Sequence, residues 1–183
     1  MTIEQTIVQM ARDAKKAASV LGRCDTPRKN QTLLAMADLL EQQADAIFRE
    51  NRKDLERAEA AGLSAAMVDR LRVDEKTIAS MAGGLREVAG YDDPVGTMGP
   101  TRMRPNGLRV ARMRIPLGVI GIIYESRPNV TIDAAGLCLK SGNAVILRGG
   151  SEAIASNRAL ARIIAQALES TGLPPQAAQV VPT

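Results

Sequence analysis

Apolar residues recur every three or four positions over roughly the first 90 residues, which predicts a series of amphipathic helices. The first apolar stripe ends at Gly22, which we expect to stop the helix. A second helix is predicted to begin with Thr26 as its N-cap and Pro27 at its first helical position. Its apolar face is expected to consist of Leu33, Met36, Ala37, Leu40, Ala44, Ile47 and Phe48.

Further helices are predicted before residue 91. A shorter charged helix covers residues 51–61 and is closed by Gly62. Ser64 and Asp74 suit the N-caps of two more, the second of which ends near Gly90. Its inward face is predicted from Ile78, Met81, Ala82, Leu85 and Val88. We therefore expect residues 1–91 to form an N-terminal helical region.

The pattern changes at residues 92–96, because Asp-Asp-Pro-Val-Gly cannot continue a helix. Pro105, Asn106 and Gly107 form a turn between two extended runs, so a β-hairpin is predicted over residues 92–115. This segment carries Arg102, Arg104, Arg109, Arg112 and Arg114. The arginines suit a solvated strand edge, where charge deters unwanted strand addition, or a docking site for acidic ligands. We also expect this edge to contact another subunit in a homo-oligomer.

The final third has a β-α-β-α-β pattern. Residues 117–123 are an apolar run that suits a strand covered on both faces, and residues 144–147 suit a second buried strand. Between them a helix is predicted over residues 130–141, and a long helix capped by Ser151 reaches residue 171 before a third strand at 179–181. The predicted class is α/β, with N-terminal helices, a β-hairpin and an incomplete Rossmann-like parallel sheet over residues 116–183.

Composition and charge exclude several functions. The net charge of +4 is spread along the chain and only three aromatic residues are available to stack on bases, so nucleic acid is not an expected partner. Histidine is absent, which excludes histidine-based triads. Cys24 and Cys138 cannot by themselves complete a zinc site, and we expect both to be unpaired. We find no secretory signal or membrane-spanning run, so a cytoplasmic location is expected.

Two polar loops are candidates for chemistry because they follow the first two predicted strands. The second loop, with Arg148, Gly149, Gly150, Ser151 and Glu152, allows close backbone approach, and amide groups at a helix start attract anionic groups. A tight loop with a helix cap explains the same residues equally well. No GxGxxG or Walker motif decides between the two interpretations.

The first loop contains Tyr124, Glu125, Ser126, Arg127, Pro128 and Asn129. Arg127 suits a phosphate or carboxylate, and Ser126 or Asn129 could donate a hydrogen bond to a developing oxyanion. On the residues alone we slightly favour the structural interpretation, in which Pro128 starts a helix and Arg127 pairs with a surface acid.

The sequence from residue 114 to residue 157 resembles the γ-glutamyl phosphate reductases, a branch of the aldehyde dehydrogenase superfamily. The stretches YESRPNVT and CLKSGNAVILRGG are typical of that branch. The resemblance extends to GLP at 172–174, DPVG at 93–96 and GLSAAMVDRL at 62–71, so it covers nearly the whole chain.

This resemblance implies reduction of L-glutamyl 5-phosphate to L-glutamate 5-semialdehyde by NADPH, with phosphate release, in proline biosynthesis. It also implies glutamate kinase as the pathway neighbour. Enzymes of this kind use a cysteine thiolate that forms a thioester, and covalent catalysis divides one difficult substitution into two easier steps. Neither cysteine here matches that position, so no catalytic residue is assigned. The chain is expected to be the amino-terminal portion of such an enzyme, without the catalytic domain and inactive alone.

The resemblance also implies roles for residues of both loops. Cofactor-binding residues are expected to be Ile123, Tyr124, Glu125, Arg148, Gly149, Gly150, Ser151 and Glu152. Substrate-binding residues are expected to be Ser126, Arg127 and Asn129. Arg148 stands where many relatives have lysine and could favour a 2′-phosphate. Ser126 stands where aldehyde dehydrogenases place an oxyanion-binding asparagine, which is a departure from the pattern.

Two alternatives remain open at this point. One is a truncated, non-catalytic binding or assembly module. The other is a sister enzyme that acts on a coenzyme A thioester, although YESRPNVT argues against it.

Overall fold

The computed structural model describes residues 2–182 of the chain. Its helices are α1 (Ile3–Leu21), α2 (Thr26–Gln42), α3 (Ala44–Ala60), α4 (Ala65–Leu71), α5 (Glu75–Gly90), α6 (Pro128–Lys140) and α7 (Ile154–Ser170). Its strands are β1 (Arg102–Met103), β2 (Arg109–Val110), β3 (Val119–Ile123), β4 (Ala144–Arg148) and β5 (Ala178–Val180). Two short 3₁₀ turns are η1 (Ser151–Ala153) and η2 (Pro175–Ala177).

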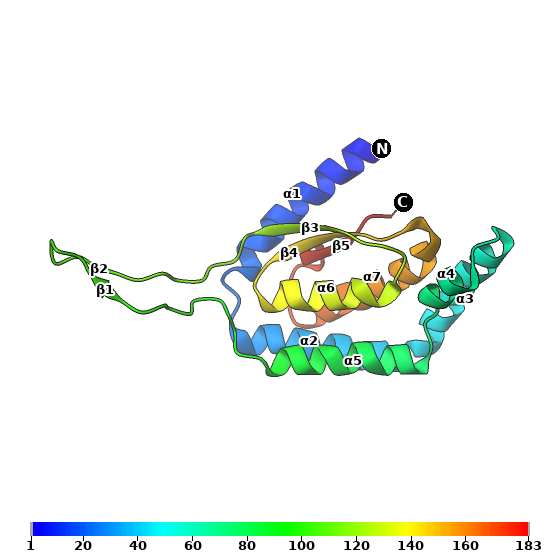
Figure 1. Ribbon diagram of the computed structural model, residues 1–183, viewed down its shortest axis with the longest axis horizontal. Helices are drawn as coiled ribbons and strands as arrows, with labels where there is room; N and C mark the ends of the chain where they lie inside the picture. Colours follow the sequence, from blue (N-terminus) through cyan, green and yellow to red (C-terminus); the bar gives the residue numbers. More distant parts are fainter. Residues whose placement is uncertain (1, 183) are drawn as a thin grey trace.

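The elements form layers around a parallel sheet with the order β3-β4-β5. Helix α1 lies on one face of the sheet and helices α6 and α7 lie on the other (Figure 1). Helices α2 and α5 form a further layer beyond α6 and α7. A single apolar core joins the helical layers to the sheet, with Leu33, Ile132, Leu147 and Leu160 completely buried. The predicted α/β class is confirmed.

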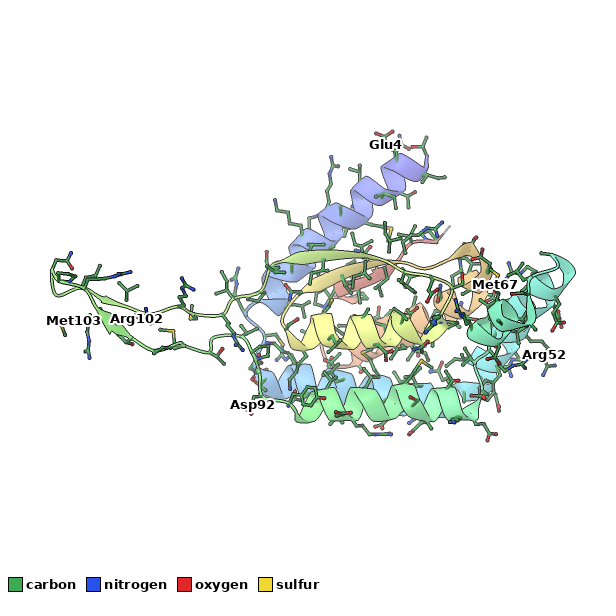
Figure 2. The ribbon with its side chains drawn as sticks, in the orientation of Figure 1. Glu4, Arg52, Met67, Asp92, Arg102 and Met103 are labelled. Carbon is green, nitrogen blue, oxygen red and sulfur yellow. The ribbon has the colours of Figure 1, made fainter. Side chains whose placement is uncertain are left out.

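Strands β1 and β2 pair antiparallel at the end of a long arm that leaves the body of the molecule (Figure 1). Figure 2 labels Asp92 at the base of this arm and Arg102 and Met103 on its strand pair. The turn predicted at residues 105–107 is present, because Gly107 has a φ of 83° and its N–H donates to the Arg104 carbonyl at 2.9 Å. The hairpin prediction is therefore confirmed.

The prediction of one helix continuing through Phe48 is wrong. The chain breaks at Gln43, whose φ of −109° and ψ of 20° are not helical, so α3 begins earlier than predicted and in a new direction. Ile47 remains buried because α3 packs against α7. An apolar stripe shared by two consecutive helices cannot reveal a break that contains no glycine or proline.

Two predicted helix caps also differ from the structure. Asp25, and not Thr26, is the N-cap of α2, because its Oδ1 accepts the Arg28 N–H at 3.2 Å. Thr26 instead donates its hydroxyl to Asp93 Oδ2 at 2.8 Å. Ser151 does not cap the long helix either, since it begins η1 and α7 starts three residues later. The predicted caps at Ser64 and Asp74 do precede α4 and α5.

Strand β3 is not covered on both faces as the sequence predicted. Its residues alternate between exposed and half-buried, and Ile123 is 86% exposed. Strand β4 pairs with one edge of β3, while within residues 2–182 nothing pairs with the other edge. The register places Ile123 beside Arg148, so β3 and β4 end at the same level and the loops that follow them start side by side.

A buried ion pair holds the base of the arm. Lys29 Nζ lies 2.9 Å from Asp93 Oδ2, and the two side chains are 1% and 12% exposed. Burial raises the pKa of Asp93, but hydrogen bonds from Lys29, the Val95 N–H and Thr26 outweigh it and hold the pKa below its ordinary value. The carboxylate therefore fixes the first turn of α2 to the segment that enters the arm.

The variant Asp93→Asn is expected to lower the free energy of unfolding at pH 7 by about 2–4 kcal/mol, because it leaves the buried Lys29 charge without its counter-ion. Since the folded pKa is depressed, the wild-type pair stabilises the protein above the ordinary aspartate pKa of about 3.9 and loses this effect as the pH falls toward the folded pKa. Urea unfolding at pH 3–7 measures both effects. The exposed neighbour Asp92, changed to Asn, is the control. A variant with the wild-type pH dependence of stability would contradict the role of the pair.

Candidate functional site

The structure brings together the two polar loops that the sequence singled out. The Tyr124 N–H donates to the Arg148 carbonyl at 3.0 Å, which continues the pairing of β3 and β4. Beyond it, the Ser126 hydroxyl donates to Glu152 Oε2 at 2.5 Å and joins the two loops directly. This hydrogen bond is the main cause that lowers the pKa of Glu152, so the carboxylate is ionised at neutral pH.

The glycines of the second loop lie against the first loop so closely that no side chain fits. A Cβ on Gly149 would lie 3.0 Å from the Tyr124 ring and would also overlap the Asn157 amide. A Cβ on Gly150 would overlap the Ser126 hydroxyl and lie 2.6 Å from Glu152 Oε2. The sequence suggested that these glycines let a ligand approach the backbone, whereas in the structure residues of the protein itself occupy the space beside them.

A buried hydrogen-bond network lies behind the loops. Thr131 in α6 donates its hydroxyl to Asn157 Oδ1 in α7 at 2.9 Å. The Tyr124 hydroxyl is 2.7 Å from the same Thr131 oxygen and therefore acts as the donor. Burial is the main cause that raises the pKa of Tyr124, which keeps the phenol protonated for this role. Sequence reasoning missed Thr131 and Asn157, although each is a polar residue on an inward helix face.

The start of α7 is bound by a carboxylate from another helix. Asp54 of α3 is completely buried, and its Oδ1 accepts the Ala155 N–H at 3.1 Å. Its Oδ2 accepts the N–H and the hydroxyl of Ser156, each at 2.7 Å. Arg57 Nη2 donates to Oδ1 at 2.5 Å. The protein's own carboxylate therefore binds the amide groups of Ala155 and Ser156 at the start of α7.

The remaining candidate residues of the first loop bind their neighbours. Arg127 Nε lies 3.0 Å from Glu125 Oε1, and Pro128 is the first residue of α6, as the structural interpretation of this loop predicted. Asn129 donates its side-chain amide to Asp133 Oδ2 one turn later, at 3.2 Å. Ile123 is 86% exposed and belongs to the open face of β3.

In the second loop, Arg148 donates to the Gly149 carbonyl at 2.7 Å and is otherwise exposed. Ser151 is exposed at the first position of η1. The exposed side chains of Ile123, Arg148 and Ser151 are therefore all available to a ligand at this end of the sheet.

A cavity of about 140 Å³ lies between α4 and the two loops. It is lined by Leu63, Met67, Arg70, Leu71, Glu125, Ser126 and Glu152. Two of these lining residues form an ion pair, with Arg70 Nη1 3.4 Å from Glu125 Oε2. Figure 2 labels Met67 on α4, at the end of the molecule where the strand-end loops lie. Sequence reasoning did not place α4 near the loops, because the helix is short and distant in sequence.

Both cysteines lack the environment of a nucleophile. Burial raises the pKa of Cys138 to about 11. Burial, followed by the nearby Asp25 carboxylate, also raises the pKa of Cys24. The two thiols are therefore almost fully protonated at neutral pH, and neither is paired in a disulfide, as the sequence predicted. Among residues 2–182 there is also no helix that is long and apolar enough to cross a membrane.

The sequence, together with this fold, places the chain in a known protein family. The sequence pattern of the aldehyde dehydrogenase family matches residues 2–183, and the chain belongs to this family. Aldehyde dehydrogenases use NAD(P) cofactors and act on small-molecule substrates.

Similar proteins point to one branch of the family. A protein of Desulfatibacillum aliphaticivorans named gamma-glutamyl phosphate reductase is 57% identical over 182 residues, which is the whole of this chain and 44% of the relative. Solved structures of gamma-glutamyl phosphate reductase from Thermotoga maritima and Saccharomyces cerevisiae match with TM-scores of 0.93 and 0.90, at 40% and 33% identity. Each covers 96% of this chain, which spans 42% and 46% of theirs. The chain therefore spans less than half the length of these relatives.

The variant Gly149→Ala is expected to destabilise the protein by about 1–3 kcal/mol, because the added methyl group would overlap Asn157 and press on the Tyr124 ring. The matched control is Gly83→Ala in α5, where a Cβ meets no heavy atom of residues 2–182 within 4 Å. This control is expected to stabilise the helix by about 0.5–1 kcal/mol. Chemical unfolding of both variants measures the difference. Equal effects of the two substitutions would contradict the close packing of the loops.

Proposed function

We propose that this chain is part of a reductase that converts L-glutamyl 5-phosphate into L-glutamate 5-semialdehyde with release of phosphate, using NADPH, in proline biosynthesis. The observation that carries the proposal is the 57% identity along the whole chain to a relative named gamma-glutamyl phosphate reductase. The sister enzyme that acts on a coenzyme A thioester lacks such support, since the acetylating aldehyde dehydrogenase from Geobacillus thermoglucosidasius is only 16% identical and shares the fold alone.

The residues at the strand ends fit one part of a dinucleotide site. The loop with Gly149 and Gly150 follows β4 at the carboxyl end of the parallel sheet, which is where ligands bind in open α/β sheets. Arg148 uses one guanidinium nitrogen on Gly149 and keeps its other N–H groups for an anion. This supports NADPH over NADH, because only NADPH carries a 2′-phosphate. When bound, the cofactor supplies the hydride for the reduction.

We assign cofactor contacts to both strand-end loops as part of the same proposal. The residues are Ile123, Tyr124, Glu125, Arg148, Gly149, Gly150, Ser151 and Glu152, and substrate contacts are proposed for Ser126, Arg127 and Asn129. Ser126 can donate to a substrate oxygen only when its hydroxyl gives up its hydrogen bond to Glu152. Arg127 is paired with Glu125 but about half exposed, so an anionic substrate can compete for it.

The chemical step needs a nucleophile that these residues do not supply. Cys138 is buried with a pKa raised to about 11, and Cys24 lies in the loop between α1 and α2, far along the chain from the strand-end loops. We therefore infer that this chain by itself binds the cofactor but does not catalyse turnover.

A substrate that is an acyl phosphate of glutamate must come from a kinase acting on glutamate, so a cytoplasmic glutamate kinase is the proposed pathway neighbour.

We further propose that the arm contacts a second copy of the protein. Met98, Met103 and Met113 on the arm are 63%, 72% and 56% exposed, and arginines flank Met103 and Met113 in the sequence. Exposed apolar side chains on a projecting strand pair suit a protein contact. The same surface supports the alternative, in which the chain is a non-catalytic assembly module.

Isothermal titration is expected to show that the chain binds NADPH more tightly than NADH. The variant Arg148→Ala should lower the affinity for NADPH about tenfold and leave that for NADH nearly unchanged, because it removes a charge-assisted hydrogen bond to the 2′-phosphate. Arg104→Ala on the arm is the matched control and should change neither affinity. Equal binding of both cofactors to the wild type and to the Arg148 variant would contradict the assignment.

A phosphate-release assay with NADPH and glutamyl phosphate separates the reductase from the assembly module. The chain is expected to bind NADPH and to release no phosphate. Turnover would contradict the inference that the chain is inactive alone, and the absence of NADPH binding would favour the assembly module.

A further inference from the structure

The cavity beside α4 has the size of a small side chain. Its volume of about 140 Å³ corresponds to four or five waters at about 30 Å³ each, which is far too small for a dinucleotide. Its apolar side comes from Leu63, Met67 and Leu71. Ser126 and Glu152 line it from the strand-end loops, so the cavity opens beside the residues that the proposed function uses.

Helix α4 is held beside the cavity by buried packing and by hydrogen bonds. Val68 and Leu71 on its inner face belong to a small buried core with Ala58 of α3 and Ala153 of η1. Asn51 of α3 donates to the carbonyl of Leu71 at 2.7 Å and accepts the N–H of Val73 at 2.9 Å, which secures the end of α4. The helix and the second strand-end loop therefore form one packed unit.

Two opposite charges that line the cavity are paired with each other. The Arg70 guanidinium and the Glu125 carboxylate are 3.4 Å apart, and their side chains are 53% and 58% exposed. Such an exposed pair contributes little to stability and is exchanged easily for other partners. An α-amino acid carries the complementary charges on adjacent groups, a carboxylate for the arginine and an ammonium for the glutamate. Arginine binds a carboxylate with two parallel hydrogen bonds, which also sets its orientation.

We propose that this cavity binds the amino-acid end of the substrate, with Arg70 on the α-carboxylate and Glu125 on the α-ammonium. The apolar side then contacts the methylene groups, and the acyl end points toward Ser126. The identification of the amino acid as glutamyl rests on the proposed function. The preference for an α-amino acid of this size rests on the charges and the volume. Arg70 did not follow from the sequence, and Glu125, which the family resemblance assigned to the cofactor, is reassigned here from the cofactor to the substrate.

The test is a titration of the ¹⁵N-labelled 183-residue chain with L-glutamate, followed by amide chemical shifts. L-Glutamate is expected to bind with a millimolar Kd and to shift the amides of Arg70, Glu125 and Ser126. Glutarate, which lacks the ammonium group, should bind at least tenfold more weakly. Arg70→Gln and Glu125→Gln should each weaken L-glutamate binding at least tenfold, whereas Arg72→Gln, an exposed neighbour, should have no effect.

A double variant separates ligand binding from a structural ion pair. Arg70→Glu combined with Glu125→Arg restores an ion pair between these two positions but removes the Arg127–Glu125 pair, so its thermal unfolding is compared with that of Glu125→Gln, which removes the same pair. The double variant should not recover L-glutamate binding, because a ligand bound in the reversed direction cannot place its acyl end toward Ser126. Recovery of wild-type affinity, unchanged binding in both single variants, or no binding of L-glutamate to the wild type would each overturn the inference.

Cofactor binding by the same proteins shows which proposal fails. Arg70→Gln is expected to bind NADPH as the wild type does, which supports two separate contacts. If the wild type binds NADPH but not L-glutamate, this inference is overturned and the reductase proposal stands. If it binds L-glutamate at Arg70 but not NADPH, the amino-acid site stands and the cofactor assignment is contradicted.

Discussion

The buried carboxylate of Asp54 is the interaction on which the geometry of the candidate site depends. It accepts two backbone N–H groups and one hydroxyl from Ala155 and Ser156, together with a guanidinium N–H from Arg57. A buried carboxylate is tolerated only when its oxygens are bound in this way, and donors at a helix start are the partners that the helix dipole favours. The bond fixes α3 against α7 at the point where the second strand-end loop enters the helix.

Behind the loops, hydrogen bonds among Tyr124, Thr131 and Asn157 join the first loop to the first turns of α6 and α7. The loops are therefore held from both sides, and Gly149 and Gly150 lie between these supports without room for a side chain. Preorganised backbone of this kind lowers the entropy that a ligand would otherwise lose on binding. Helix α4 packs against the same unit through Ala153, so the second strand-end loop and the proposed amino-acid cavity lie beside each other.

Much of this architecture follows from local sequence signals. The periodicity of the helices, the turn at Gly107 and the apolar run of β4 each have a physical cause within a few residues. The two loops could be placed together because parallel strands put their carboxyl ends on one edge. The contacts that shape the site do not follow from local sequence signals, because they join distant residues: Asp54 and Ser156 are 102 residues apart in sequence. Nothing in the polarity of Asp54 distinguishes it from an exposed acid on a charged helix. The break at Gln43 depends likewise on the packing of α3 against α7.

Hydrogen exchange of the backbone amides tests the central claim most directly, because it reports how firmly each loop is held with and without NADPH. The account predicts that Asp54→Ala speeds exchange at residues 149–156 and leaves α2 and α5 unchanged. It also predicts that NADPH slows exchange in both strand-end loops of the wild type and does so less in the variant. Exchange in residues 149–156 of the variant at the wild-type rate, or protection by NADPH that lies outside both loops, would contradict it.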